Sequence, residues 1–175
     1  MNIATKKFLI VVVFSIVILT AGVIYFAFSS YNRYRVLQPL EYSHKAHVES
    51  AGMKCTDCHF YVDKMASASI PSLEVCQTCH NDEPVSTSPE EVKLLSYVKE
   101  GKEIPWRQVY EVPDHVYFSH RRHVIDGELD CSECHGNMAE LTKSVSYQAI
   151  PMTMKNCLDC HKQRKVTTDC LACHR

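Results

Sequence analysis

The chain has 175 residues, of which 46% are hydrophobic and 22% are charged, and its formal net charge is −1. Five glycines and seven prolines are too few for a disordered, low-complexity chain. The sequence carries no nucleic-acid-binding signature, so we expect no nucleic-acid partner.

The first predicted element is an apolar segment at residues 8–28, which contains no charged residue and is flanked by Lys7 and Arg33. At 1.5 Å per residue it spans about 30 Å, the thickness of one hydrocarbon core. We therefore predict an uncleaved transmembrane helix within a membrane-anchor domain of residues 1–35. A cleaved signal peptide is the alternative, although its apolar region is normally shorter, about 7–15 residues.

The most informative feature is the motif Cys-x-x-Cys-His, which occurs five times and uses all ten cysteines. This spacing is typical of c-type haem attachment, in which two thiols form thioethers with haem and the adjacent histidine coordinates iron. A zinc or disulfide scaffold is the alternative, but neither requires a histidine after every second cysteine. We predict five covalently bound haem c groups. Their attachment residues are Cys55, Cys58, Cys76, Cys79, Cys131, Cys134, Cys157, Cys160, Cys170 and Cys173, and their proximal ligands are His59, His80, His135, His161 and His174.

The chain has ten histidines, so five remain outside these motifs, all in two short clusters. One such histidine for each haem would make every iron six-coordinate. We expect His44 at the haem of Cys55 and Cys58, and His120 at the haem of Cys131 and Cys134. His47 and His123 are expected to reach other haems.

Two kinds of residue compete for the fifth distal position. His115 is favoured because it completes the count of ten histidines for ten axial positions. The alternatives are Met154, which lies shortly before Cys157, and Met152. A methionine ligand would raise the reduction potential of that haem, whereas a methionine outside the coordination sphere would pack at a haem edge.

An internal repeat organises the haem-binding part of the chain. Residues 42–59 and 118–135 align without a gap, and each block is followed by a further Cys-x-x-Cys-His motif. The pattern predicts two-haem repeats at about 42–80 and 118–161, with a fifth haem at 170–174.

Residues 36–175 form the predicted haem domain, which is too small for a large hydrophobic core without its cofactors. With about 28 residues for each haem, we predict a mostly irregular fold with few short α-helices, a haem-filled core and one N-terminal transmembrane helix.

One longer helix is predicted at residues 89–101. Ser88 is a suitable N-cap, Pro89 a suitable first helical residue and Gly101 a suitable stop. The expected apolar stripe of this helix consists of Val92, Leu95 and Val98, with Leu94 as a further candidate.

The repeated Tyr/Phe-Ser-His-x-x-His blocks with their Cys-x-x-Cys-His motifs resemble the class III multihaem cytochromes c, which are bis-histidine proteins. The segment at residues 104–120 resembles the multihaem subunits of alternative complex III and of menaquinone reductase complexes. The resemblance implies electron transfer at a quinone-linked membrane complex.

The sequence therefore predicts a membrane-anchored electron-transfer subunit with no catalytic residues of its own. Its expected partners are the membrane and either other subunits of a quinone oxidoreductase or periplasmic cytochromes. Because such motifs receive haem outside the cytoplasm, we expect a single-pass protein of the inner membrane with its haem domain on the periplasmic side. The alternatives are a stand-alone quinol dehydrogenase and a multihaem reductase, and the latter would need an open iron position.

Overall fold

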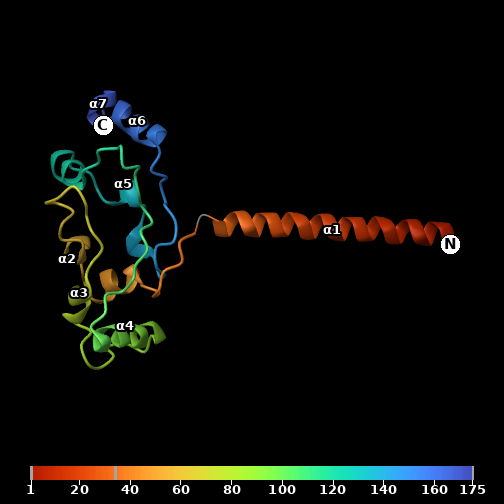
Figure 1. Cartoon of the computed structure of the whole chain (residues 1–175), viewed down its shortest axis with the longest axis horizontal. Coiled ribbons are helices and arrows are strands. Elements are labelled where there is room, and N and C mark those ends of the chain that lie inside the picture. The colour runs from red at the N-terminus through yellow and green to blue at the C-terminus, as the bar shows by residue number, and fades with distance from the viewer. Residues whose placement is uncertain (1, 34, 175) are drawn as a thin grey trace. The chain divides into compact units, whose positions relative to one another are not determined.

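The structure is a computed structural model that describes residues 2–33 and 35–174. It divides into two compact units, Met1–Arg35 and Val36–Arg175. We refer to the second as the C-terminal unit. In the described residues of this unit, short helices are joined by loops and the only β-type pairing is an isolated bridge between Val116 and His174 (Figure 1). The mostly irregular fold class predicted from the sequence is confirmed.

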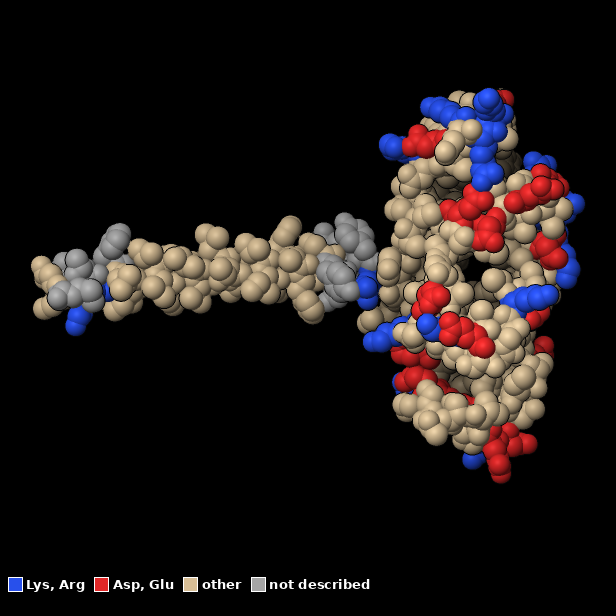
Figure 2. All heavy atoms as spheres, turned by 180° about the vertical axis from the view of Figure 1, so that it is seen from behind, with Lys and Arg blue, Asp and Glu red and all other residues tan. Residues whose placement is uncertain are grey.

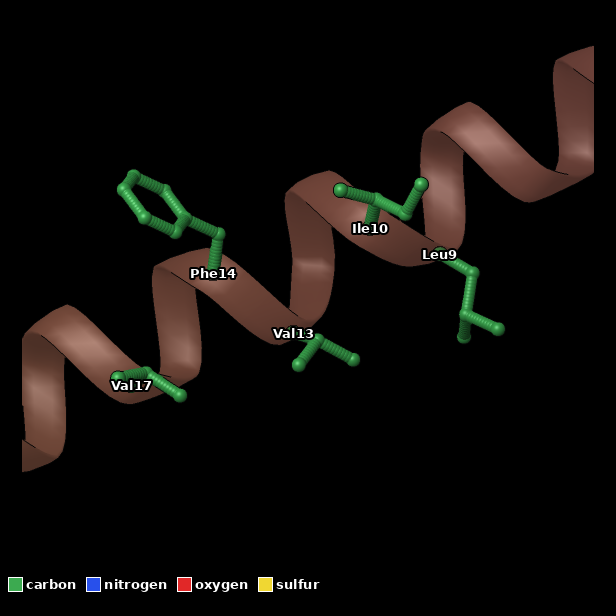
Figure 3. Close-up of a pocket in the computed structure, with 5 residues that line it drawn as sticks. All are labelled: Leu9, Ile10, Val13, Phe14 and Val17. Carbon is green, nitrogen blue, oxygen red and sulfur yellow. The ribbon is translucent and has the colours of Figure 1, made fainter.

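The first unit is dominated by helix α1 (Ile3–Arg33), whose stretch Leu9–Ser30 is long and apolar enough to cross a membrane. Its side chains include the aliphatic and aromatic groups drawn in Figure 3, and none of the residues in its most apolar window is buried by the rest of the chain. Length and composition of this kind suit either a membrane anchor or a signal sequence.

The helices of the C-terminal unit are mostly single turns placed at the sequence motifs. They are η1 (Ala46–Ser50), α2 (Cys55–Cys58), α3 (Leu73–Gln77), α4 (Pro89–Glu100), η2 (Arg122–Asp126), α5 (Ser132–His135), η3 (Met138–Glu140), α6 (Met154–Gln163) and α7 (Cys170–Cys173).

Helix α4 begins and ends as its sequence predicts. The Ser88 side chain accepts a hydrogen bond from the backbone N–H of Glu90, Pro89 is the first helical residue, and Gly101 ends the helix with a positive φ of 62°. The expected apolar stripe is only partly correct. Val92 is 62% exposed, and the buried positions are Leu94 and Glu91.

A small apolar cluster lies where α3 and α4 meet. It consists of Leu40, Leu73, Leu94 and Ile104, with Trp106 packed against it. Val62 is the remaining buried hydrophobic residue among those the structure describes. A core of this size is small for the whole unit, because stability from apolar burial scales with the area removed from water.

The two repeat blocks adopt the same local structure. In each, a π-helical turn follows the Ser-His segment, and the backbone N–H after that turn donates to a carbonyl five residues earlier, at Ala46 or Arg122. The aromatic residue that opens each block stacks on its second histidine. The ring centroids are 4.4 Å apart for Tyr42 and His47, and 4.6 Å apart for Phe118 and His123.

The charged side chains of the C-terminal unit are of both signs and spread over the face seen in Figure 2. Many form local ion pairs, such as Lys93 with Glu90 and Lys155 with Asp159. Exposed pairs of this kind contribute little to stability, about 0–1 kcal/mol each.

Candidate metal centres

Each Cys-x-x-Cys-His motif forms a single helical turn or part of a longer helix. In four motifs the histidine N–H donates to the carbonyl of the first cysteine, for example His59 to Cys55 at 2.9 Å and His174 to Cys170 at 2.8 Å. Cysteines three positions apart on such a turn lie on the same face. The turn therefore presents two thiols and one imidazole to a single group.

We number these candidate sites by motif in chain order, and each is named by its two cysteines and its histidine. Site 1 is Cys55, Cys58 and His59; site 2 is Cys76, Cys79 and His80; site 3 is Cys131, Cys134 and His135; site 4 is Cys157, Cys160 and His161; site 5 is Cys170, Cys173 and His174.

The structure brings one of the remaining histidines to four of the five motif histidines. The ring-centroid separations are 6.2 Å for His47–His80, 6.3 Å for His120–His135, 6.2 Å for His123–His161 and 5.5 Å for His115–His174. At site 1, His59 lies close enough to His44 to lower its pKa electrostatically.

These separations suit one metal ion held between two imidazoles. Metal–nitrogen bonds of about 2.0–2.1 Å on either side of one ion, with each ring centre about 1.1 Å behind its nitrogen, separate the centroids by about 6.2–6.4 Å. Three of the pairs agree with that range, and the pair of His115 and His174, at 5.5 Å, is closer. The described residues contain no cluster of three or more His, Cys, Asp or Glu able to hold a metal ion, whereas haem iron takes only two protein ligands.

Hydrogen bonds to the backbone orient the second histidine of each repeat. The Nδ1 of His47 lies 2.8 Å from the Ser43 carbonyl, and that of His123 lies 2.7 Å from the Ser119 carbonyl. Since a carbonyl only accepts, Nδ1 carries the proton and Nε2 keeps its lone pair. The neutral tautomer that a metal ligand requires is thereby selected in both repeats.

His115 is brought to site 5 by backbone pairing. Val116 forms the isolated bridge with His174, and the N–H of Tyr117 donates to the Cys173 carbonyl at 2.7 Å. The alternative ligand Met154 is 64% exposed at the start of α6. Of these two candidates, His115 is the one whose ring faces that of His174.

Burial keeps several of these imidazoles neutral. It lowers the pKa of His44 to about 4, with smaller contributions from His59 and His47. Burial also lowers the pKa of His59 and of His135. The Nδ1 of His44 is itself buried without a hydrogen-bond partner. Neutral imidazoles are the form that binds metals.

Electrostatic contacts between the free thiols give the sites an order in space. Burial and then Cys58 raise the pKa of Cys76, and burial and then Cys55 raise that of Cys131. Burial and then Cys160 likewise raise the pKa of Cys134. These contacts place site 1 between site 2 and site 3, and site 4 beyond site 3.

The last site continues the same order. Burial and then Cys173 raise the pKa of the Cys157 thiol. Figure 1 shows the helices of the five motifs in the same succession along the C-terminal unit, from α3 through α2, α5 and α6 to α7, so sites 2 and 5 are the two outermost sites.

One functional side chain was missed by the sequence reasoning. Glu91 of α4 is 5% exposed, and its Oε1 lies 2.7 Å from the Nδ1 of His80. Its spacing could have indicated burial, because Glu91 lies on the same face of the helix as Leu94 and Val98. From sequence alone, an acidic residue on an amphipathic helix is ordinarily expected to lie on the solvent-exposed face.

Comparisons with known proteins identify the family of the chain. The family model described as "Cytochrome c7 and related cytochrome c" matches residues 40–93 and 116–175. The chain is also 34% identical over 162 residues to the menaquinone reductase, multiheme cytochrome c subunit, of Nitratidesulfovibrio vulgaris, an alignment that covers 79% of this chain and 77% of that protein. The family match includes all five Cys-x-x-Cys-His motifs, and this chain belongs to the family of cytochrome c7 and related cytochromes c.

Proposed function

We propose that this chain is a membrane-anchored pentahaem cytochrome c, which transfers electrons between a quinone-linked membrane complex and periplasmic redox partners. The observation that carries the proposal is the presence of a second histidine opposite four of the five motif histidines. Membership of the cytochrome c family implies covalently bound haem c. Bound haem c supplies a one-electron Fe(III)/Fe(II) couple.

In this proposal the ten cysteines would hold the haems and the ten histidines would bind their irons. The second ligands are His44 at site 1, His47 at site 2, His120 at site 3, His123 at site 4 and His115 at site 5. Six-coordinate sites of this kind suit electron transfer, because they leave no position for a substrate. The protein's own contribution is to fix the order, orientation and burial of the five ligand sets.

Two observations support the membrane and quinone parts of the proposal. Helix α1 has a 22-residue candidate span with a mean hydropathy of 2.8. The relative from Nitratidesulfovibrio vulgaris is named as a subunit of menaquinone reductase. We therefore propose that α1 anchors the C-terminal unit beside a quinone-reactive partner, with the haem sites on the periplasmic side of the inner membrane.

The test is purification of the tagged full chain from its native membranes in mild detergent. Intact mass gives the number of haems attached to the chain, and mass spectrometry of the bound proteins identifies its partners. Membranes from an untagged strain provide the control. We expect five haems and stable co-purification of quinone-binding subunits.

The same preparation is then mixed with a menaquinol analogue, and haem reduction is followed by absorbance. Reduction of the haems by the menaquinol analogue in the complex, but not in the isolated chain, would agree with the proposal. A chain recovered alone that still oxidises quinol would instead identify a stand-alone quinol dehydrogenase. Fewer than five attached haems would contradict the pentahaem assignment itself.

A further inference from the structure

Glu91 is the only buried charged residue among those that the structure describes, and it lies against a proposed haem ligand. Its Oε1 accepts from His80 Nδ1 and from the backbone N–H of Val85, both at 2.7 Å. Its Oε2 accepts from the backbone N–H of Ser86 at 2.8 Å and from the Ser86 hydroxyl. Helix α4 holds the carboxylate in this place because Leu94, one turn later, packs in the apolar cluster.

The surroundings of Glu91 favour a full negative charge. Its two oxygens accept four hydrogen bonds, from His80, the backbone N–H of Val85, and the backbone N–H and hydroxyl of Ser86. Hydrogen bonds of this kind stabilise the charged form of a carboxyl group. An ionised carboxylate can only accept hydrogen bonds, so His80 donates from Nδ1 and keeps the lone pair of Nε2.

No other histidine in the described residues has a carboxylate partner. The Nδ1 atoms of the others that are bonded face backbone carbonyls. These pairs are His47 with Ser43, His59 with Ser69, His120 with Ala66, His123 with Ser119 and His161 with Thr167. A carboxylate attracts the Nδ1 proton more strongly than a neutral carbonyl does. The imidazole of His80 is therefore the most electron-rich of these bonded rings.

We propose that Glu91 is a positioning residue that lowers the reduction potential at site 2 and makes it the lowest of the five. This inference rests on the function proposed above. A more basic imidazole donates more charge to iron and stabilises the oxidised form. The buried negative charge adds to this effect, because it opposes the arrival of an electron.

The position of site 2 gives the proposal its functional meaning. Site 2 lies at one end of the spatial order, next to site 1. A low potential at a terminal site means that an electron received there passes downhill to the rest of the chain. Glu91 thus gives the site at one end of the series a lower reduction potential than the sites that lack a carboxylate partner.

The test is a potentiometric titration of the full-length holoprotein, followed by absorbance and by electron paramagnetic resonance, for the wild type and for Glu91→Gln. We expect the reduction potential of the lowest of the five components to rise by about 59 mV, which is a tenfold shift toward the reduced form for a one-electron couple. One low-spin resonance should shift its g values, and the other four components should stay in place.

Two variants separate this role from a merely structural one. Glu90→Gln removes the same charge from the adjacent residue of α4, which contacts Lys93 and the Glu41 backbone instead of a histidine. Ser86→Ala removes one hydrogen bond to Glu91 but leaves the bond to His80, so it should move the lowest component less than Glu91→Gln does. Glu90→Gln should not move the lowest component.

Several results would overturn the inference. These are an unchanged titration in Glu91→Gln, a shift confined to a higher component, or equal shifts in Glu91→Gln and either control. If Glu91→Gln gives no holoprotein, Glu91→Asp decides, because it keeps the charge but withdraws it from His80 and should raise the same component. A haem count below five in the wild type would instead count against the proposed function.

Discussion

At the scale of single residues, His115 is the proposed second ligand of the haem at site 5. It faces His174 with a centroid separation of 5.5 Å, whereas Met154 is largely exposed. His115→Phe keeps an aromatic ring in place but removes the lone pair that binds metal. We expect one haem of the five to become high-spin and to bind CO, measured by absorbance and electron paramagnetic resonance. Met154→Leu should leave all five haems low-spin, and the reverse pattern would establish methionine ligation.

A second prediction concerns Tyr42, for which the other repeat provides the comparison. Phe118 occupies the equivalent position and stacks on His123 as Tyr42 stacks on His47. Tyr42→Phe should therefore change the free energy of unfolding by less than about 0.5 kcal/mol. Tyr42→Ala should cost about 3 kcal/mol, because it removes the ring that packs against the ligand. Chemical denaturation of the holoprotein measures both, and equal effects would show that stacking is unimportant.

At the scale of elements, α4 is anchored by its buried face. Leu94 is 7% exposed and packs in the apolar cluster, whereas Val92 on the same helix is 62% exposed. We expect Leu94→Ala to lower the free energy of unfolding by about 2–5 kcal/mol and Val92→Ala to change it by less than about 0.5 kcal/mol. Denaturant titration followed by circular dichroism makes the comparison. Similar losses in both variants would contradict the assignment of the buried face.

The ends of α4 were predicted from the sequence, but its buried face was predicted only in part. Ser88, Pro89 and Gly101 predicted its ends, because capping is decided by neighbouring residues. Its buried face was predicted less well, because the histidine and the loop that satisfy Glu91 come from another segment. Spacing within the motifs predicted the proximal residues, whereas the opposition of His115 and His174 depends on pairing between distant segments.

At the scale of the whole molecule, the described polypeptide has too small an apolar core to fold alone. Its buried hydrophobic residues are Leu40, Val62, Leu73, Leu94 and Ile104. We expect chain produced in cells without haem-attachment machinery to show little helical circular dichroism from its C-terminal unit and rapid proteolysis there. Holoprotein from competent cells is the control. Cooperative unfolding of the haem-free unit would contradict this prediction, because it would show that the polypeptide folds without haem.

The pairing of distant histidines also has a consequence for the order in which the protein matures. His47 faces the histidine of the second motif and not of the first, and His123 faces that of the fourth and not of the third. His115 faces His174, beyond two intervening motifs. Under the proposed function, the C-terminal unit crosses the membrane from residue 36 onward, so each of these histidines is exported before the motif that it faces. We therefore expect the ligand pairs to form one after another during export, with the pair of His115 and His174 formed last.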